Sequence, residues 1–377
     1  MIRTLVRLGR RWSDPRSEFR VRAARILRAE AGYPEGMTDM ILGRFFGKLT
    51  ASALRELQSK LRRHPVLGRS GDWAAVLPGN VPDPLLLSVV WAVAAGKKIC
   101  LKMSTRQRCF GEWVARSLKC EFGDLCEGLE WTASQNVFYR RAKTAGAVFA
   151  YGSDATIREV RRSAGPRTGF IGFGHALSAG VVFRGQTVGS GLARTARLAA
   201  TEMWLYDQKG CLSPQFFLVE GEAGRFAEAL AGELHALDAS LGRVRRTQEE
   251  SVRRRIGLAR LDAMTLGRRP RLARIGTGTG PSAAVYVLKS GVFPCPVGHQ
   301  VALAASFQNL RQIKRLLAPH QSYLHCIGIA GTPRERAQVR HTFAVTQTPR
   351  LCPLGRMQTP PTGPGNIEMG DSPKNPL

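Results

Sequence analysis

The spacing of apolar positions changes along the chain and indicates where one kind of structure gives way to another. Up to about residue 70, apolar side chains recur at helical intervals among arginines, as in residues 17–30, and short Gly and Pro breaks separate these patterns. The pattern predicts a helical N-terminal region over residues 1–70.

Beyond residue 72 the apolar residues gather in short runs that are typical of strands. These runs lie at 73–77, 98–102, 147–151, 169–173 and 179–183. Helical patterns lie between several of them. Strands that alternate with helices indicate parallel βαβ units. We therefore expect an α/β fold with a dinucleotide-binding domain over residues 71–205.

A second α/β unit follows the first along the chain. A helical pattern at 193–205 leads into a segment that contains Cys211, and this segment precedes strand-like runs at 216–219 and 283–288 and a helical pattern at 224–241. We expect a catalytic thiol domain over residues 206–345.

The remaining C-terminal segment, residues 346–377, differs in composition. Residues 359–377 hold five prolines and three glycines, which predicts a disordered tail. Further upstream, the glycine-rich stretch 276–280 is a weak phosphate-loop candidate, because no helical pattern clearly follows it.

No segment predicts a membrane span. The most apolar stretch, residues 85–96, is too short to cross a bilayer and follows Pro84, so it predicts a buried helix over 84–96. The basic N-terminus lacks both an uninterrupted apolar core and a small-residue cleavage site, which argues against a signal peptide.

The formal net charge of +28 raises nucleic acid as a partner, but aromatic residues make up only 7% of the chain and offer no stacking platform. The densest basic stretch, residues 243–274, holds eleven arginines and is interpreted as exposed helix faces. A basic nucleic-acid binder therefore remains an alternative without a specific motif. Such a surface would also attract anionic cofactors and thioesters.

The eight cysteines form no CxxC pair and no compact framework, which favours a reduced, cytoplasmic protein over a disulfide scaffold. Cys295 with His299, and His325 with Cys326, are conceivable metal ligands, but their irregular spacing argues against a zinc site. We expect no metal. Burial among apolar side chains is the simpler interpretation of these cysteines.

Cys211 is the strongest candidate for chemistry. It follows Gly210 at the beginning of a new element, where a glycine lets a substrate approach the backbone and where a reactive thiolate is expected. This position suggests covalent catalysis.

Three short motifs end predicted strands. Pro-Gly-Asn-Val-Pro (78–82) ends the first, Lys-Met-Ser (102–104) the next and Tyr-Gly-Ser (151–153) a later one. Parallel sheets bind ligands beyond the carboxyl ends of their strands, so each motif is placed to contact a cofactor.

This order of motifs resembles the aldehyde dehydrogenase superfamily. More closely, the chain looks like the acyl-CoA reductases that supply long-chain aldehyde to bacterial luciferase, and their non-luminous relatives. The resemblance implies a Rossmann-type cofactor domain joined to an α/β catalytic domain. The motifs that carry it are Leu-Pro-Gly-Asn-Val-Pro (77–82), Tyr-Gly-Ser-Asp-Ala-Thr-Ile (151–157), Gly-Phe-Gly-His (172–175), Tyr-Asp-Gln-Lys-Gly-Cys-Leu-Ser-Pro-Gln (206–215) and Cys-Pro-Leu-Gly-Arg-Met-Gln-Thr-Pro-Pro (352–361).

The resemblance also implies roles for two residues in the chemical step. Cys211 would be the nucleophile, and the side-chain amide of Asn80 would donate to the oxyanion that develops when a thiolate attacks a thioester. Without the other motifs, the simpler interpretation of Asn80 is a turn residue between two prolines.

The cofactor-binding residues follow from the same resemblance. Lys102 and Ser104 would bind the adenosine ribose of a nicotinamide cofactor, with Gly152 and Ser153 near its pyrophosphate. Relatives that prefer NAD carry an acidic residue after Lys-x-Ser, whereas Thr105 and then Arg106 follow here. Positive charge in place of a carboxylate suits a 2′-phosphate, so NADPH is expected.

Departures from the superfamily indicate the direction of the reaction. Aldehyde-oxidising members carry a glutamate base, but residues 169–175 hold no carboxylate, so hydrolysis of an acyl-enzyme would lack its base. His175 in this stretch would donate a proton or orient the cysteine, or serve as a structural hydrogen bonder. No acid near 291–294 matches the glutamate that holds the nicotinamide ribose in the wider superfamily.

The expected function is NADPH-dependent reduction of a long-chain fatty acyl-CoA, or of an acylated donor protein, to a fatty aldehyde. The resemblance implies a homo-oligomer. A scaffold that keeps the fold but does not turn over is the other alternative, because the family's ending after Pro361 is replaced by Thr-Gly-Pro-Gly-Asn.

Overall fold

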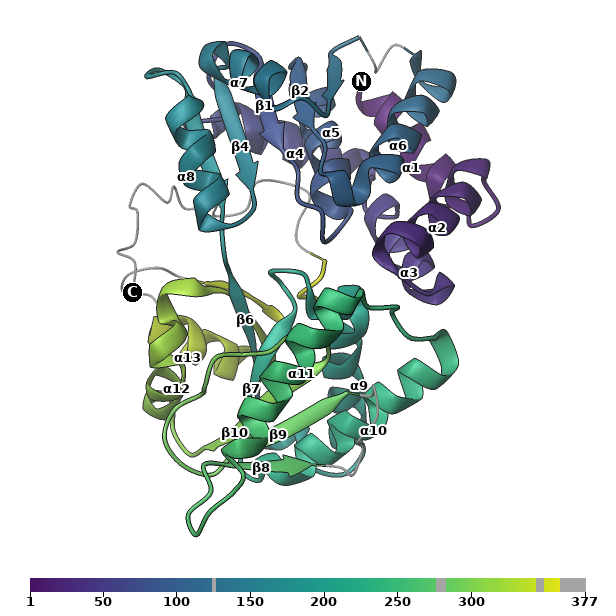
Figure 1. Cartoon of the computed structure of the whole chain (residues 1–377). Helices are drawn as coiled ribbons and strands as arrows, with labels where there is room; N and C mark the ends of the chain where they lie inside the picture. Colours follow the sequence, from purple (N-terminus) through teal and green to yellow (C-terminus); the bar gives the residue numbers. More distant parts are fainter. Residues whose placement is uncertain (124–126, 276–282, 344–348, 360–377) are drawn as a thin grey trace. The chain divides into compact units, whose positions relative to one another are not determined.

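The computed structural model describes residues 1–123, 127–275, 283–343 and 349–359 (Figure 1). The chain forms two compact units: Met1–His175 together with Thr359, and Ala176–Gln358. The expected division at 205/206 therefore differs from the division of these units, at 175/176. The reason is strand β6 (Leu177–Val182), which pairs with strands of the second unit and carries the following helix with it.

Helices occupy the beginning of the first unit, as the spacing of apolar residues indicates. Ser17 and Thr50 cap two of them by accepting hydrogen bonds from backbone amides in the first turn. Their core is aromatic, since the ring of Trp12 stacks on Phe19 with centroids 3.7 Å apart. The helices are α1 (Ile2–Ser13), α2 (Glu18–Ala31), α3 (Glu35–Phe46) and α4 (Ala51–Arg63).

The rest of the first unit is a parallel sheet of strand order β3-β2-β1-β4-β5. Its strands are β1 (Trp73–Val76), β2 (Ile99–Lys102), β3 (Leu129–Thr132), β4 (Ala147–Tyr151) and β5 (Gly169–Phe173). The helices that follow them are α5 (Asp83–Ala95), the short η1 (Thr105–Gln107), α6 (Arg108–Glu121), α7 (Gln135–Thr144) and α8 (Asp154–Ser163).

Side chains alternate between the two faces of this sheet, as expected for strands buried on both sides. On one face, Val148 packs with Phe138 of α7 and Val160 of α8. On the other, the ring of Phe149 lies edge-on to Trp73 and to Trp91 of α5. The stretch expected as a buried helix is thus α5, and no helix in the described part of the chain is long and apolar enough to cross a bilayer.

The second unit contains a larger sheet of order β12-β11-β6-β7-β10-β9-β8. Every pair is parallel except β8 with β9. Its further strands are β7 (Pro214–Glu220), β8 (Leu272–Ile275), β9 (Ala284–Leu288), β10 (Val301–Phe307), β11 (Leu324–Ala330) and β12 (Arg350–Pro353). Its helices are η3 (Arg184–Gln186), α9 (Ser190–Trp204), η4 (Leu205–Gln208), α10 (Ala223–Leu241), α11 (Gln248–Ala263), α12 (Leu310–Leu317), η5 (Ala318–Tyr323) and α13 (Pro333–Phe343).

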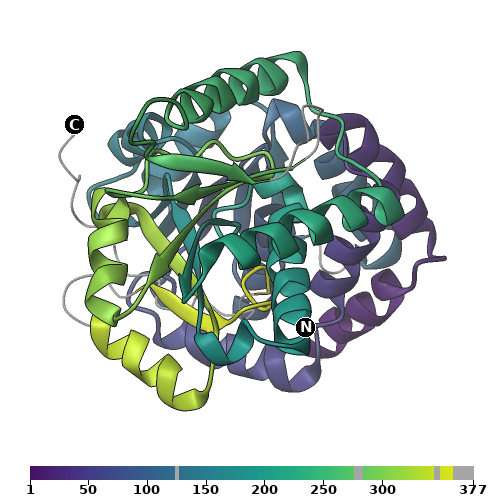
Figure 2. The ribbon, with the colours of Figure 1, turned by 90° about the horizontal axis from the view of Figure 1, so that it is seen from below.

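Helices cover both faces of this sheet, as the second view of the ribbon shows (Figure 2). Phe217 of β7 points to α10, where its ring meets Phe226. Its neighbour Phe216 points to the opposite core, which includes Ile313 of α12 and Val339 of α13. Two largely parallel sheets covered by helices confirm the expected α/β class.

Several strands were not predicted from the sequence. β3 alternates polar and apolar residues at a sheet edge, and β10 and β11 are short apolar runs that periodicity alone does not distinguish from buried helix. The phosphate-loop candidate at 276–280, and all of the predicted tail but Thr359, lie outside the described residues.

The packing makes opposite predictions for two glycines of the second unit. A Cβ at Gly180 in β6 would lie 2.6 Å from the Phe217 ring, whereas a Cβ at Gly232 in α10 has no neighbour within 4 Å. Gly180→Ala is expected to lower the free energy of unfolding by about 1–3 kcal/mol through overpacking. Gly232→Ala is expected to raise it by about 1 kcal/mol through helix propensity. Urea unfolding of the matched pair checks both signs, and equal effects would contradict this packing.

Candidate functional site

Two loops meet at the carboxyl edge of the first unit's sheet. The Leu77 amide donates to the Lys102 carbonyl at 3.0 Å, so the loops leave β1 and β2 side by side. A Cβ at Gly79 would lie 2.3 Å from Ser104 Oγ and 2.9 Å from Arg106 Cβ. Only glycine allows the first loop to pack this closely on the second. The structure therefore brings together Gly79, Ser104 and Arg106, with Lys102 half-buried beside them.

The N-terminal helical region supports these loops. The fully buried Tyr33 donates its hydroxyl to the Asn80 carbonyl at 2.7 Å, while the Asn80 residue itself is exposed. The Glu30 carboxylate accepts hydrogen bonds from the amides of Cys109 and Phe110, at 2.7 and 3.0 Å, and so caps the beginning of α6. A tyrosine and a glutamate that the sequence analysis did not single out thus hold both loops.

A helix begins where β4 ends. Ser153 caps α8 by accepting a hydrogen bond from the Thr156 amide at 3.2 Å. A Cβ at the preceding Gly152 would lie 3.1 Å from Thr156 Cβ, so this turn is also closely packed. The positive end of the helix dipole and the amides of its first turn suit a phosphate group. Asp154 accepts a hydrogen bond from the backbone amide of the exposed His175 at 3.3 Å, which ties the end of this unit to α8.

These features fit a dinucleotide. Glycine cradles, a serine hydroxyl, two cationic side chains and a helix N-terminus lie along the carboxyl edge of neighbouring parallel strands, where nucleotides bind in such sheets. Gly79, Lys102, Ser104, Arg106, Gly152 and Ser153 are the residues that would hold it.

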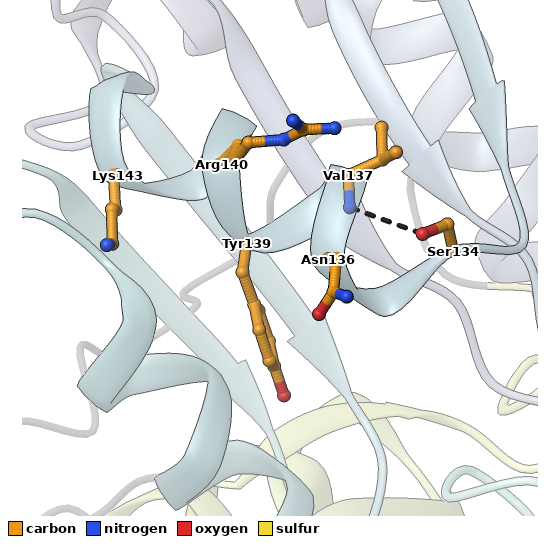
Figure 3. A pocket seen from close by; sticks show the side chains of 6 residues that line it. All are labelled: Ser134, Asn136, Val137, Tyr139, Arg140 and Lys143. Carbon is orange, nitrogen blue, oxygen red and sulfur yellow. Dashed lines mark hydrogen bonds between the residues drawn. The ribbon is translucent and has the colours of Figure 1, made fainter.

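A shallow hollow of about 570 Å³ lies on α7, beyond the carboxyl end of β3 (Figure 3). Ser134 caps this helix through the Val137 amide, at 3.4 Å. The Tyr139 hydroxyl is engaged by Glu159 of α8, so the tyrosine links the two helices. The lining is basic at one end and consists of Ser134, Asn136, Val137, Tyr139, Arg140 and Lys143.

Cys211 lies in the second unit, in the turn between η4 and β7. The residue is exposed, and its sulfur forms no disulfide bond. The hydroxyl of the buried Ser178 in β6 donates to the Cys211 carbonyl at 2.7 Å, and the Ser213 amide donates to the Gly210 carbonyl at 3.0 Å. The backbone around the cysteine is therefore fixed at the amino edge of the sheet while its side chain stays accessible.

The C-terminal motif supports the same turn. The side-chain amide of Gln358 donates to Ser213 Oγ at 2.7 Å. The backbone amides of Met357 and Gln358 both donate, at 2.9 Å, to the fully buried Glu202 carboxylate of α9. Two sequence motifs that are more than a hundred residues apart thus meet beside Cys211.

The backbone immediately before Cys211 is strained. Tyr206, Asp207 and Gln208 have φ angles of 60°, 54° and 56°, which is the left-handed region that residues other than glycine seldom adopt. All three are buried. Such conformations cost about 1–3 kcal/mol each and persist only where surrounding contacts hold them.

Asp207 provides one such contact. Its fully buried carboxylate accepts hydrogen bonds from Arg246 at 2.9 and 2.6 Å and lies 2.8 Å from His299 Nδ1. Burial opposes ionisation, but the hydrogen bonds from His299 and Arg246 outweigh it and hold the pKa of Asp207 below its ordinary value. The carboxylate is therefore ionised throughout the neutral range.

Lys209 is anchored on the other side of the strained residues. Its ammonium pairs with the Glu250 carboxylate at 2.8 Å, and both side chains are largely buried. Burial would raise the pKa of Glu250, but the hydrogen bonds from Lys209 and from the Thr247 backbone, together with the positive charge of Lys209, outweigh it, and the pKa lies below its ordinary value. Glu250 also completes a capping box with Thr247 at the beginning of α11.

The sequence matches the family described as Acyl-CoA reductase (LuxC) over residues 2–365. The chain belongs to this family. Its members are aldehyde-forming oxidoreductases, and the aldehyde dehydrogenase-like fold implies a nicotinamide cofactor. No curated protein sequence matches the chain.

Solved structures agree with the acyl-CoA reductase assignment at the level of the fold. Methylmalonate-semialdehyde dehydrogenase from Oceanimonas doudoroffii has a TM-score of 0.70 at 13% identity, with 96% of this chain and 79% of that chain covered. A benzaldehyde dehydrogenase from Corynebacterium glutamicum gives 0.67 at 13% identity, covering 90% and 79%. A proline utilization A structure has a TM-score of 0.67 at 14% identity. The match covers 93% of this chain but only 37% of that chain, so this protein spans little more than a third of that chain's length.

The interpretation of residues 243–274 as exposed helix faces holds only in part, because only four of the eleven arginines lie in a helix, α11. Arg254 is only 6% exposed, and Arg246 is paired with the buried Asp207. Burial, followed by repulsion from Arg246, lowers the pKa of Arg254 to about 10. The neighbouring Arg253 and Arg255 are exposed as expected. An arginine that pairs with an acid far away in the sequence carries no local signal. The sequence alone therefore does not identify Arg246 as the partner of Asp207.

The Asp207 pair predicts how stability depends on pH. Because its pKa in the folded state is lowered, the pair contributes fully above the ordinary value of about 4 and is lost as the pH falls through the folded value. At pH 7, Asp207→Asn is expected to lower the free energy of unfolding by about 3–5 kcal/mol. The difference should shrink below pH of about 4. Denaturant unfolding at neutral and acidic pH checks this, with the exposed Glu228→Gln as the matched control.

Proposed function

We propose that this protein reduces long-chain fatty acyl thioesters to fatty aldehydes through a covalent acyl group on Cys211. The observation that carries the proposal is an exposed thiol on a turn whose backbone is fixed on both sides, in a chain of the acyl-CoA reductase family. A fixed backbone and a solvent-accessible sulfur suit a nucleophile.

The first step is acyl transfer. The Cys211 sulfur forms a bond to the thioester carbonyl carbon, the bond from that carbon to the sulfur of CoA breaks, and the departing thiolate takes up a proton from solvent. The substrate is a fatty acyl-CoA or an acyl group on a donor protein. The basic surface of the chain, with a net charge of +28, favours the approach of the CoA phosphates.

Hydrogen-bond donors stabilise the oxyanion of this step. The Cys211 backbone amide and the Asn80 side chain are the proposed donors, and each such donor contributes about 3 kcal/mol in comparable sites. Tyr33 supports this role for Asn80, because it binds the Asn80 carbonyl and leaves the residue exposed.

The second step reduces the acyl group. A reduced nicotinamide cofactor, when bound, supplies the hydride. Addition of hydride to the thioester carbon gives a hemithioacetal on Cys211, and its collapse breaks the carbon–sulfur bond and releases the aldehyde and the thiolate. His175 is exposed at the end of the first unit and is the proposed proton donor or orienting group.

The preference for NADPH is proposed to come from Arg106. Arg106 is exposed and lies two residues after Ser104. The Ser104 hydroxyl accepts a hydrogen bond from the Arg106 backbone amide at 3.3 Å and thereby fixes the turn. No acidic side chain occupies positions 102–108, so a 2′-phosphate meets positive charge without repulsion.

The acyl-enzyme predicts a mass increase on one residue. Wild-type protein mixed with a long-chain acyl-CoA should gain one acyl group at Cys211, and should consume NADPH when it is added. Cys211→Ala should lose both, with activity down by at least about 10³-fold as for other nucleophile deletions. Cys295→Ala, another exposed free cysteine, is the matched control and should retain both. Intact and peptide mass spectrometry read the adduct, and an adduct elsewhere would contradict the proposal.

The cofactor assignment predicts an altered nucleotide preference. Arg106→Ala should raise the KM for NADPH by about 10-fold, which corresponds to one charge-assisted phosphate contact, and should leave the KM for NADH nearly unchanged. Arg116→Ala on α6, also exposed, is the control for lost positive charge. Equal effects of Arg106→Ala on both nucleotides would remove Arg106 from phosphate recognition.

A further inference from the structure

Two left-handed turns face each other in the second unit. One is formed by Tyr206, Asp207 and Gln208, the first three residues of the motif (206–215) that contains Cys211. The other is formed by His299 and Gln300, with φ angles of 55° and 62°, immediately before β10. None of these five residues is glycine, so the surrounding contacts must impose both conformations.

Arg246 joins the two turns. Besides its two hydrogen bonds to the Asp207 carboxylate, it donates to the His299 carbonyl at 3.1 Å. The Arg254 guanidinium donates to the same carbonyl, also at 3.1 Å, and the His299 ring lies against the Asp207 carboxylate. Loss of the Asp207 pair would therefore release both turns at once.

Gln208 adds a second, uncharged connection. Its side-chain oxygen accepts the Val301 amide at 2.9 Å, and its side-chain nitrogen donates to the Pro214 carbonyl at 2.8 Å. The amide of this side chain thus bridges the residues at the beginnings of the neighbouring strands β7 and β10. It fixes the entrance to β7, the strand that Cys211 precedes.

The restraints continue to the cysteine without a gap. Lys209 is held by Glu250, and the Cys211 carbonyl is held by Ser178. No other part of the described chain has three consecutive non-glycine residues in the left-handed region. The strain is placed directly beside the proposed nucleophile.

We infer that Asp207, acting through Arg246 and His299, and Gln208, acting through Val301 and Pro214, are positioning residues. They hold the turn before Cys211 in its strained conformation and so aim the thiol at the acyl carbon. This inference rests on the proposed role of Cys211. The two side chains do not take part in bond making; they set the direction from which the sulfur approaches the substrate.

Three variants separate positioning from general stability. Arg246→Lys keeps the positive charge but cannot give two hydrogen bonds to Asp207 and a third to His299. Asp207→Asn keeps a side chain that tolerates the left-handed region but removes the charge. Asp262→Asn is the matched control, because Asp262 also accepts hydrogen bonds from an arginine, Arg274, in this unit but has no hydrogen bond with residues 206–208.

Hydrogen exchange of the full-length protein reports the turn without any substrate. In Arg246→Lys and Asp207→Asn, amides in the peptide that covers 205–216 should exchange at least about 10-fold faster than in the wild type, and those of β9 should not. Asp262→Asn should leave the 205–216 peptide unchanged. If Asp207→Asn does not fold, Arg246→Lys alone decides the outcome. Unchanged exchange in a folded Arg246→Lys would overturn the inference.

Acylation kinetics report the aim of the thiol. In single-turnover mixing with a long-chain acyl-CoA, Arg246→Lys should lower the maximal rate of adduct formation at Cys211 at least about 10-fold. The concentration for half-maximal rate and the alkylation of Cys211 by iodoacetamide should change less than about 2-fold, because the thiol remains exposed. A parallel fall in acylation and alkylation would contradict positioning. A wild type that forms no adduct would contradict the proposed function, and hydrogen exchange would then still decide whether these residues hold the turn.

Discussion

The ionised Asp207 carboxylate, buried against Arg246, is the interaction on which the second unit's site depends. A buried carboxylate is costly unless several donors satisfy it, and here Arg246 and His299 do so. The same contacts fix two strained turns. Apolar side chains at this position would avoid the cost of burying charge, but they could not form these hydrogen bonds. This polar cluster lies at the amino ends of the central strands β7 and β10, beside the cysteine that we propose as the nucleophile.

The first unit uses a different physical device. Its loops are fixed by close backbone packing at Gly79 and by hydrogen bonds from the N-terminal helices, through Tyr33 and Glu30. Buried charge plays a smaller part there. In the first unit, close packing fixes the loops that we propose to bind the nucleotide; in the second, hydrogen bonds fix the backbone around the proposed nucleophile.

The sequence was sufficient for the fold and for most of its elements, because short apolar runs and their intervening helical patterns are local signals. It also located the Cys211 turn and the carboxyl-edge loops, since glycines and serines at strand ends have local meaning. It could not reveal the left-handed conformation at 206–208, because no glycine marks it. Nor could it distinguish Arg246, which is bound to Asp207, from the exposed Arg245 beside it, because the partner lies 39 residues away.

The packing of Gly79 against Ser104 has a consequence for protein engineering. Larger side chains at either position would push the two loops apart, so changing them would alter the shape of the nucleotide edge together with any contact. Arg106 meets this packing through its Cβ, and the residue itself is exposed. With the role that we propose for Arg106, cofactor selectivity would be adjustable at this one exposed position, whereas the closely packed loops behind it would tolerate few larger side chains.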